Sequence, residues 1–263
     1  MGDGRRLVAV DIGGTFTDVA VYDPASGRVR HAKSLTTYDD FIVGIDRCMR
    51  FIETDLAGCA SFKHGTTLVI NMLIQRSGAR TALVTTRGFR DVLEIGRGNR
   101  VEPFKPDYRR DAPLAPRRLR FELDERIDGE GRVVRAPDDA ELRSLALEID
   151  RAGAASVAIC LLNSYRNPVH EQQVAERLRA LLPGRFVTAS SDLTREWYEY
   201  ERSATVTANA YVGPGVRDYL GKLEAALDAR GFAGSKFFMG SGAGVLSPAR
   251  AAEGPIHLVE SGP

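Results

Sequence analysis

The amino-acid sequence predicts an α/β protein, and two observations carry the prediction. After an initial run of strands, apolar stretches with the spacing of strands alternate with stretches that have helical spacing. In addition, residues 8–22 have the pattern of a β-hairpin, because two apolar strands flank a short turn that contains two glycines. The chain has 263 residues, 43% of them hydrophobic, which is enough for one large domain or two modest ones.

Composition narrows the possible function classes. The formal net charge is +1, which argues against a general role in binding nucleic acid or a membrane surface. No apolar run is long enough to span a bilayer, and the first residues lack the apolar core of a signal peptide. The three cysteines form no C-x-x-C pair, which favours free buried thiols in a reducing compartment over disulfides or structural zinc. We therefore expect a cytoplasmic protein that binds neither nucleic acid nor membrane.

The hairpin turn predicts a phosphate-binding site. Gly13 and Gly14 let the backbone approach an anion, and successive N–H groups in such a turn form an anion-binding nest. Thr15 and Thr17 add hydroxyl donors, and Asp11 is a hard oxygen ligand that Mg²⁺ prefers, directly or through water. The chain has no Walker loop, and a strand follows the glycines where a Rossmann loop has a helix. The alternative is an ordinary hairpin with a Gly-Gly tip.

The remaining elements follow from periodicity and from turn residues. Up to residue 95 we expect a strand near 29–33, a helix over 41–52 that begins after Asp39 or Asp40, a short strand from 62, a helix over 68–76, a strand over 79–85 and a short helix over 89–95. Residues 96–116 contain four prolines and many charges, which predicts a long surface loop.

Beyond this loop the pattern of alternating elements resumes. We expect a hairpin over 119–134, a helix from 138 with a core face of Leu142, Leu145 and Ile149, a strand over 156–162, a helix that opens at Asn167-Pro168, a strand over 186–189, a long helix over 204–230 with a bend near Pro214, a strand over 236–239, a short helix over 248–253 and a last strand over 256–260.

Three more segments carry candidate site residues. Thr66 and Thr67 lie at a strand-to-helix junction, where they suit either a helix cap or an anion site, and Asn71 lies one turn further. The glycine cluster at 239–245 suits either contact with a nucleotide or substrate, or a flexible turn. The charged and aromatic run at 195–202 precedes the long helix, where Glu201 favours the positive helix end; the alternative is a helix entry with surface ion pairs.

Taken together, these segments resemble the hydantoinase A and 5-oxoprolinase family. Residues 11–18 (Asp-Ile-Gly-Gly-Thr-Phe-Thr-Asp) are similar to the first phosphate motif of that family. Further segments agree in order across essentially the whole chain: 64–67 with Asn71, 85–97, 164–171, 199–202 leading to 209–214, and 261–263. The resemblance implies an actin-like, sugar-kinase-like ATPase fold, in which two ribonuclease-H-like lobes hold ATP. It also implies that ATP activates an amide or carbonyl oxygen, either to open a cyclic amide or to carboxylate a ketone.

Carried over to this sequence, the resemblance implies ATP and Mg²⁺ as cofactors, with Asp11 beside the metal. The implied cofactor-binding residues are Gly13, Gly14, Thr15, Phe16, Thr17, Asp18, Gly240, Ser241 and Gly242. The implied catalytic residues are Asp11, Thr66, Thr67, Asn71 and Glu201. The chain departs from the family at residues 240–244, where Gly-Ser-Gly-Ala-Gly replaces the usual Gln-Ser-Asn-Gly-Gly.

The resemblance also implies a domain organisation and partners. Residues 1–95 would form a ribonuclease-H-like phosphate-binding core, 96–200 an inserted α/β subdomain, and 201–263 a long helix and return to the core. Family members are far longer, so we expect a second lobe after residue 263 and a hydantoinase B-type partner subunit. The expected function is the N-terminal lobe of an ATP-dependent cyclic amide hydrolase, inactive by itself. The alternatives are a ketone carboxylase subunit, a sugar-type kinase and a non-catalytic assembly module.

Overall fold

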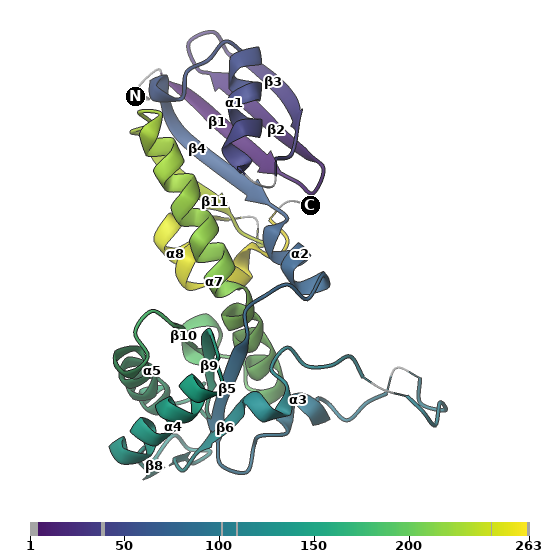
Figure 1. The fold of residues 1–263 in the computed structure, drawn as a ribbon, viewed down its shortest axis with the longest axis vertical. Helices are drawn as coiled ribbons and strands as arrows, with labels where there is room; N and C mark the ends of the chain where they lie inside the picture. Colours follow the sequence, from purple (N-terminus) through teal and green to yellow (C-terminus); the bar gives the residue numbers. More distant parts are fainter. Residues whose placement is uncertain (1–4, 38–39, 101, 109, 243, 262–263) are drawn as a thin grey trace. The chain divides into compact units, whose positions relative to one another are not determined.

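The computed structural model describes residues 5–37, 40–100, 102–108, 110–242 and 244–261, and its contacts divide the chain into two compact units. Unit 1 comprises residues 1–77 and 215–263, and unit 2 comprises residues 78–214. Strands and helices occur in both units (Figure 1), so the predicted α/β class is confirmed. Each unit is described by itself.

Unit 1 contains a six-stranded sheet in the order β12-β11-β4-β1-β2-β3. Its strands are β1 (Arg6–Ile12), β2 (Phe16–Asp23), β3 (Arg28–Leu35), β4 (Cys59–Thr66), β11 (Ser235–Met239) and β12 (Val245–Leu246). The first three strands form an antiparallel meander, whereas β4 pairs in parallel with both β1 and β11. The predicted hairpin over residues 8–22 is therefore confirmed.

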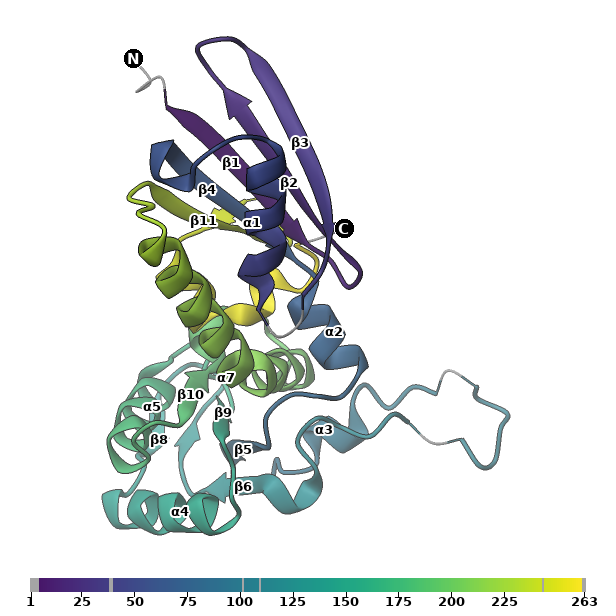
Figure 2. The ribbon, with the colours of Figure 1, turned by 45° about the horizontal axis from the view of Figure 1, so that its top comes forward.

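Strand alternation gives this sheet one apolar face. In β1 the side chains of Val8, Val10 and Ile12 are buried while those between them are more exposed, as a strand with one covered face requires. Helix α1 (Phe41–Phe51) packs against β2 and β3 (Figure 2). The side chain of Asp40 caps α1 by accepting a hydrogen bond from the Ile42 backbone at 3.0 Å. The alternative cap, Asp39, lies outside the described residues. The other short elements of unit 1 are α2 (Leu68–Ile74), α8 (Pro248–Glu253) and the 3-10 turns Leu56–Gly58 and Pro255–Leu258.

Unit 2 contains a four-stranded sheet in the order β10-β9-β5-β6, and every strand pair in it is parallel. The strands are β5 (Thr81–Thr86), β6 (Arg120–Leu123), β9 (Ser156–Cys160) and β10 (Phe186–Ala189). Helices α4 (Asp139–Arg151) and α5 (Val169–Leu181) pack on one face through an apolar cluster that includes Leu142, Leu145 and Ile149, as predicted. A second apolar cluster of this unit contains Leu83, Val206 and Ala210, which pack together. The remaining elements are α3 (Val92–Ile95), α6 (Ser190–Leu193), β7 (Arg126–Ile127), β8 (Val133–Arg135) and a 3-10 turn over Arg117–Leu119.

Helix α7 (Glu199–Ala229) begins five residues before the predicted start at 204 and contains Pro214, the last residue of unit 2. Glycines flank this proline because neighbouring side chains come close. A Cβ atom at Gly213 would lie 2.6 Å from the Phe186 ring, and one at Gly215 would lie 2.7 Å from Cε of Met72. Both distances are shorter than side-chain contacts allow, so larger residues would force a local shift.

Several predictions of elements need correction. Residues 256–260 form the end of a 3-10 turn and a hydrogen-bonded turn rather than a strand. In the expected hairpin over 119–134, only β7 and β8 pair with each other, because β6 pairs with β5 in the main sheet. Pro168 is the N-cap residue of α5, whereas we expected it at the first helical position.

The contact division also differs from the predicted parts 1–95, 96–200 and 201–263. Strand β5 and helix α3, which we expected in the first core, belong to unit 2 because β5 pairs with β9 and β6. The described part of residues 96–116 contains neither helix nor strand, in agreement with the predicted loop. All three cysteines are buried: Cys48 in α1, Cys59 in β4 and Cys160 in β9. Within the described ranges, no helix has the length and apolar character that crossing a bilayer would require.

Candidate functional site

The tip of the β1–β2 hairpin is held in place by the residue that follows β3. The Gly13 N–H donates to the Phe16 carbonyl at 3.0 Å and closes the turn. The hydroxyl of Thr36 donates to the Gly13 carbonyl at 2.9 Å, and its backbone N–H donates to the Thr15 carbonyl, also at 2.9 Å. Gly14, Thr15 and Phe16 are exposed. The tip is therefore a fixed and accessible backbone turn.

Thr17 and Asp18 lie on opposite faces of β2. Thr17 is 0% exposed, and its hydroxyl lies 3.3 Å from that of Thr36. A Cβ atom at Gly44 of α1 would lie 3.1 Å from the Thr17 hydroxyl, so this side chain points toward the helix beneath the tip. Asp18 lies on the other face, where it forms an ion pair with Lys33 at 3.1 Å. Strand alternation thus makes Thr17 a support for the tip rather than an exposed donor.

Asp11 belongs to a row of residues that crosses four strands. It is opposite Asp18 of β2 and Gly65 of β4, and Asp18 is in turn opposite Lys33 of β3. Residues directly opposite one another share a face of the sheet, so the two carboxylates are neighbours. Burial raises the pKa of Asp11, and the charge of Asp18 raises it further, while Lys33 lowers it.

The Asp11 carboxylate also has an unsatisfied oxygen. Its Oδ1 atom is buried and accepts no hydrogen bond from any described residue. Buried polar atoms are nearly always paired, so an orphaned carboxylate oxygen indicates a cation or donor that binds there. Mg²⁺ takes one or two protein carboxylates and completes its coordination with water and phosphate oxygens. The donor set at Asp11 fits that pattern.

Gly65 and Ser261 enclose the Asp11 carboxylate from the side of β4. A Cβ atom at Gly65 would lie 3.0 Å from the Ser261 carbonyl and 3.2 Å from Asp11 Oδ1, which explains why a glycine stands there. The Ser261 hydroxyl accepts from the Thr66 N–H at 3.1 Å and donates to the Thr66 carbonyl at 2.7 Å. The segment that ends at Ser261 is thereby fixed to the end of β4.

The Thr66-Thr67 pair lies at the start of α2, where Thr67 is the N-cap residue but makes no side-chain capping bond, so the cap bond comes from Thr66. The Thr66 hydroxyl accepts from the Leu68 N–H at 3.1 Å at the start of α2, and Thr66 is only 4% exposed. Asn71 donates from its side-chain amide to the Thr67 hydroxyl at 3.2 Å. The capping interpretation of Thr66 is therefore confirmed, and the catalytic roles of Thr66, Thr67 and Asn71 stay predictions.

A buried histidine links this region to α7. His64 is 1% exposed, and burial lowers its pKa to about 4, so its ring is neutral near pH 7. Its Nδ1 lies 3.2 Å from the Val10 carbonyl, and its Nε2 lies 2.5 Å from the Tyr219 hydroxyl. Because a carbonyl only accepts, Nδ1 carries the proton, and Nε2 accepts from Tyr219. The Thr66 hydroxyl also bonds to Tyr219.

This histidine predicts a pH dependence of stability. The unfolded chain binds a proton at His64 near pH 6.5, whereas the folded chain does so only near pH 4. Stability therefore falls as pH drops through that window, by about 2 kcal/mol between about pH 7 and about pH 5. Urea unfolding at the two pH values should show a smaller drop for His64→Gln than for the wild type. An equal drop in both proteins would contradict the prediction. The raised pKa of Asp11 does not account for a drop, because protonation of that carboxylate favours the folded state as pH falls.

The second glycine turn, with Gly240, Ser241 and Gly242, lies at the tip of the β11–β12 hairpin. The Gly240 N–H donates to the Gly244 carbonyl at 2.8 Å, and β12 rather than a helix follows at once. The backbone N–H of Ser241 donates to the His257 carbonyl at 2.8 Å, and its hydroxyl accepts from Glu260 at 3.0 Å. The turn is thus attached to the same segment that carries Ser261. Its cofactor-binding role stays a prediction.

Glu201 belongs to unit 2 and forms an ion pair with Arg97. Its Oε2 atom is buried and has no partner among the described residues. The cavity around this pair measures about 540 Å³ and is also lined by Tyr198, Glu199 and Tyr200. Its predicted catalytic role stays a prediction.

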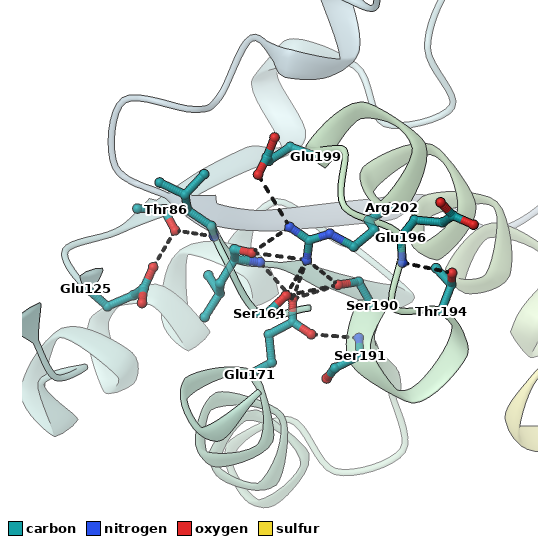
Figure 3. A network of polar contacts seen from close by, with 12 residues as sticks. Thr86, Glu125, Ser164, Glu171, Ser190, Ser191, Thr194, Glu196, Glu199 and Arg202 are labelled. Atoms are coloured by element: carbon teal, nitrogen blue, oxygen red, sulfur yellow. Dashed lines mark hydrogen bonds and ion pairs between the residues drawn. The ribbon is translucent and has the colours of Figure 1, made fainter. Parts of the chain in front are cut away.

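Sequence reasoning missed a buried ionic network in unit 2 (Figure 3). Arg202 and Glu171 are both 0% exposed, and their charged groups lie 3.8 Å apart. Glu171 Oε1 accepts from the hydroxyls of Ser164 and Ser190, each at 2.7 Å, and from the Leu161 N–H at 2.8 Å. Arg202 donates to the same two hydroxyls and to the Leu161 carbonyl. The network brings together segments 164–171 and 199–202, two of those that carry the resemblance.

A second buried pair lies in the same unit. His170 Nδ1 lies 2.6 Å from Glu125 Oε2, and both side chains are almost fully buried. Thr86 donates to the other oxygen of Glu125 and accepts from the Leu162 N–H at 2.9 Å. A charged residue in the sequence normally indicates a surface position, and no short-range pattern marks these exceptions. Among the described residues, no group of three or more His, Cys, Asp or Glu side chains is arranged to hold a metal ion.

Comparison with known protein families gives two matches that together cover most of the chain. The family described as "Hydantoinase/oxoprolinase N-terminal region" matches residues 7–182. The family described as "Hydantoinase/oxoprolinase" matches residues 202–263. The chain is also 35% identical to the uncharacterized protein MJ0964 of Methanocaldococcus jannaschii, over 97% of this chain and 38% of that protein.

Two solved structures share the fold. The crystal structure of the ATP-dependent caprolactamase from Pseudomonas jessenii has a TM-score of 0.87 and 28% identity, covering 98% of this chain and 38% of that one. The nucleotide-free structure of acetone carboxylase has a TM-score of 0.85 and 25% identity, covering 98% of this chain and 39% of that one. The chain therefore spans less than half the length of these relatives.

Proposed function

Since the chain belongs to the hydantoinase/oxoprolinase family, we propose that it contributes the phosphate-binding part of an ATP-dependent enzyme that opens a cyclic amide. The observation that carries the proposal is the unpaired, buried oxygen of Asp11 beside a fixed and exposed glycine turn. A carboxylate of this kind supports binding of Mg²⁺ with the phosphates of ATP, which the tip contacts through Gly13, Gly14 and Thr15.

The chemistry explains why ATP is needed. An amide carbonyl is a poor electrophile, and transfer of a phosphoryl group to its oxygen converts that oxygen into a good leaving group. Catalysis of phosphoryl transfer depends on positioning and on stabilisation of charge rather than on covalent chemistry by the protein. In this proposal Mg²⁺ neutralises phosphate charge, Asp11 fixes the position of the metal, and Thr36 and Thr17 hold the tip rigid.

The proposal includes a fold assignment. Unit 1 is a ribonuclease-H-like lobe of an actin-like, sugar-kinase-like ATPase, and a second lobe completes the ATP site. The order β3-β2-β1-β4-β11, with an antiparallel meander followed by parallel strands, supports this assignment. The two-lobe arrangement predicts that this chain alone releases little phosphate from ATP. A relative, the caprolactamase of Pseudomonas jessenii, is described as a subunit, which supports the proposal of a partner subunit; we propose that this partner is of the hydantoinase B type.

Mg-ATP titration of the chain tests the phosphate site. Calorimetry should give binding that weakens at least tenfold, about 1.4 kcal/mol, in Asp11→Asn, which removes the charge but keeps the shape. Asp23→Asn, the same change at the other end of β2, should bind like the wild type because Asp23 bonds only locally. Equal affinity of all three proteins would refute the role of Asp11.

A second candidate function is ATP-dependent carboxylation of a ketone, which the similarity to acetone carboxylase supports. The two reactions share activation of a carbonyl oxygen and differ in the substrate. Phosphate release by the whole enzyme should be measured with 5-oxoproline and hydantoin, and separately with acetone plus bicarbonate. Stimulation by a cyclic amide alone supports the first proposal, and stimulation that requires both acetone and bicarbonate supports the second.

A further inference from the structure

The face of the unit 1 sheet that points away from α1 carries a row of three charged side chains. Asp11 of β1 lies opposite Asp18 of β2, and Asp18 lies opposite Lys33 of β3. Figure 2 shows these three strands side by side. Like charges that stand directly opposite each other on a sheet repel. The two neighbouring carboxylates therefore require a cation, and Lys33 supplies one to Asp18.

Lys33 is held above β2 by two contacts. Its Nζ lies 3.1 Å from Asp18 Oδ1 and 4.8 Å from the centroid of the Phe16 ring. Phe16 and Asp18 are two residues apart in β2, so their side chains share a face of the sheet. Phe16 directly follows Thr15 of the exposed hairpin tip. The ammonium group thus contacts both an acid of the row and the residue next to the tip.

The ion pair between Lys33 and Asp18 can open at little cost. The two side chains are 56% and 47% exposed, and water solvates both charges when such a pair separates. Lysine carries a compact charge on a flexible stem, so its ammonium group can move while the backbone of β3 stays fixed. Among the described residues, neither Asp11 nor Asp18 forms an ion pair with any other cation. Lys33 is therefore an exchangeable counter-ion for this pair of acids.

We propose that Lys33 exchanges with a divalent cation on the Asp11–Asp18 pair and then pairs with a phosphate group of the nucleotide. The inference rests on the proposed ATP site. A divalent cation that binds both carboxylates supplies the charge that Lys33 supplied before. The ammonium group is then free to pair with a phosphate held at the tip, beside Phe16. Metal and nucleotide consequently favour each other's binding, because each removes a competitor of the other.

Titration with Mn²⁺ alone tests the exchange without any nucleotide, with electron paramagnetic resonance as the readout. Mn²⁺ prefers the same oxygen ligands as Mg²⁺. Lys33→Met removes the competing cation and should bind Mn²⁺ about two- to fivefold more tightly than the wild type. Asp18→Asn removes a ligand and should bind Mn²⁺ more weakly. Loss of a lysine that only supports the sheet would not strengthen metal binding.

Titration with ATP in the presence of a metal chelator tests the second half of the exchange, with ligand-observed NMR as the readout. Lys33→Met should bind metal-free ATP about fivefold more weakly than the wild type. Lys33→Arg keeps the charge and should retain the affinity of the wild type. Asp18→Asn releases Lys33 and should bind metal-free ATP at least as tightly as the wild type. The two ligands thus shift in opposite directions in each variant, which misfolding cannot produce.

Lys63→Met is the matched control. Lys63 is an exposed lysine on the same face of the sheet, opposite Ala9 on the other side of β1, and its loss should leave both affinities unchanged. The inference is overturned if Lys33→Met binds both ligands like Lys63→Met, if it binds both more weakly, or if the wild type binds no Mn²⁺. Asp11→Asn separates this outcome from failure of the ATP proposal, which Asp11→Asn alone decides through its affinity for Mg-ATP.

Discussion

Replacing Arg202 by methionine is expected to lower the free energy of unfolding by about 3–5 kcal/mol, because it leaves a buried carboxylate without its cation. Glu171 is fully buried, and Arg202 donates to the same serine hydroxyls that bond to it. Methionine fills a similar volume, so most of the loss comes from charge and hydrogen bonds rather than from a void. Urea unfolding of the wild type and the variant measures the difference.

Two comparisons make this prediction specific. Arg195→Met changes an exposed arginine in the same unit and should alter stability by less than about 0.5 kcal/mol. Adding Glu171→Gln to Arg202→Met removes the uncompensated charge and should recover part of the loss. If Arg202→Met costs no more than Arg195→Met, the buried pair does not contribute to stability as the structure indicates.

Removing the Tyr219 hydroxyl has the second-largest expected effect on stability. Tyr219→Phe leaves His64 Nε2 without a donor in a site that is 1% exposed, and it also removes one hydrogen bond of the Thr66 hydroxyl, which keeps its bond from the Leu68 N–H. Each unsatisfied buried group costs about 1–3 kcal/mol, so we expect a total loss of about 2–3 kcal/mol. Denaturant unfolding measures it.

The matched control for that variant is Tyr198→Phe. Tyr198 is 58% exposed, and the stability of the control should stay within about 0.5 kcal/mol of the wild type. Since Thr66 also caps α2, the Tyr219→Phe variant should bind Mg-ATP more weakly than the wild type does. This loss of affinity should be smaller than the loss caused by Asp11→Asn. A stability loss no greater than that of the control would show that the contact between His64 and Tyr219 is energetically unimportant.

The features that sequence predicted correctly are those that neighbouring residues determine. The hairpin follows from two alternating strands around a glycine turn, and the start of α1 follows from a capping aspartate at Asp40. Helix α4 begins after a capping aspartate and presents the expected apolar face. Each of these signals lies within a few turns or one strand pair, so it requires no knowledge of the remainder of the fold.

The features that sequence missed depend on contacts between distant residues. Residues 256–260 are apolar enough for a strand but join no sheet, because short apolar runs do not distinguish a strand from a helical turn. Arg202 and Glu171 are separated by a strand and a short helix, and only the folded chain places them together. The same holds for the row from Gly65 through Asp11 to Lys33, which strand register creates.

The three buried cysteines can report local unfolding of the protein without any added label site. The thiolate is the form of cysteine that attacks a thiol reagent, and burial raises the pKa of Cys160 to about 11 and those of Cys48 and Cys59 above their usual value. Labelling therefore proceeds only when a thiol becomes exposed by local or global unfolding. Cys48 and Cys59 report on unit 1, and Cys160 reports on unit 2. Mass spectrometry of labelled peptides can thus time the opening of each unit separately in one unmodified molecule.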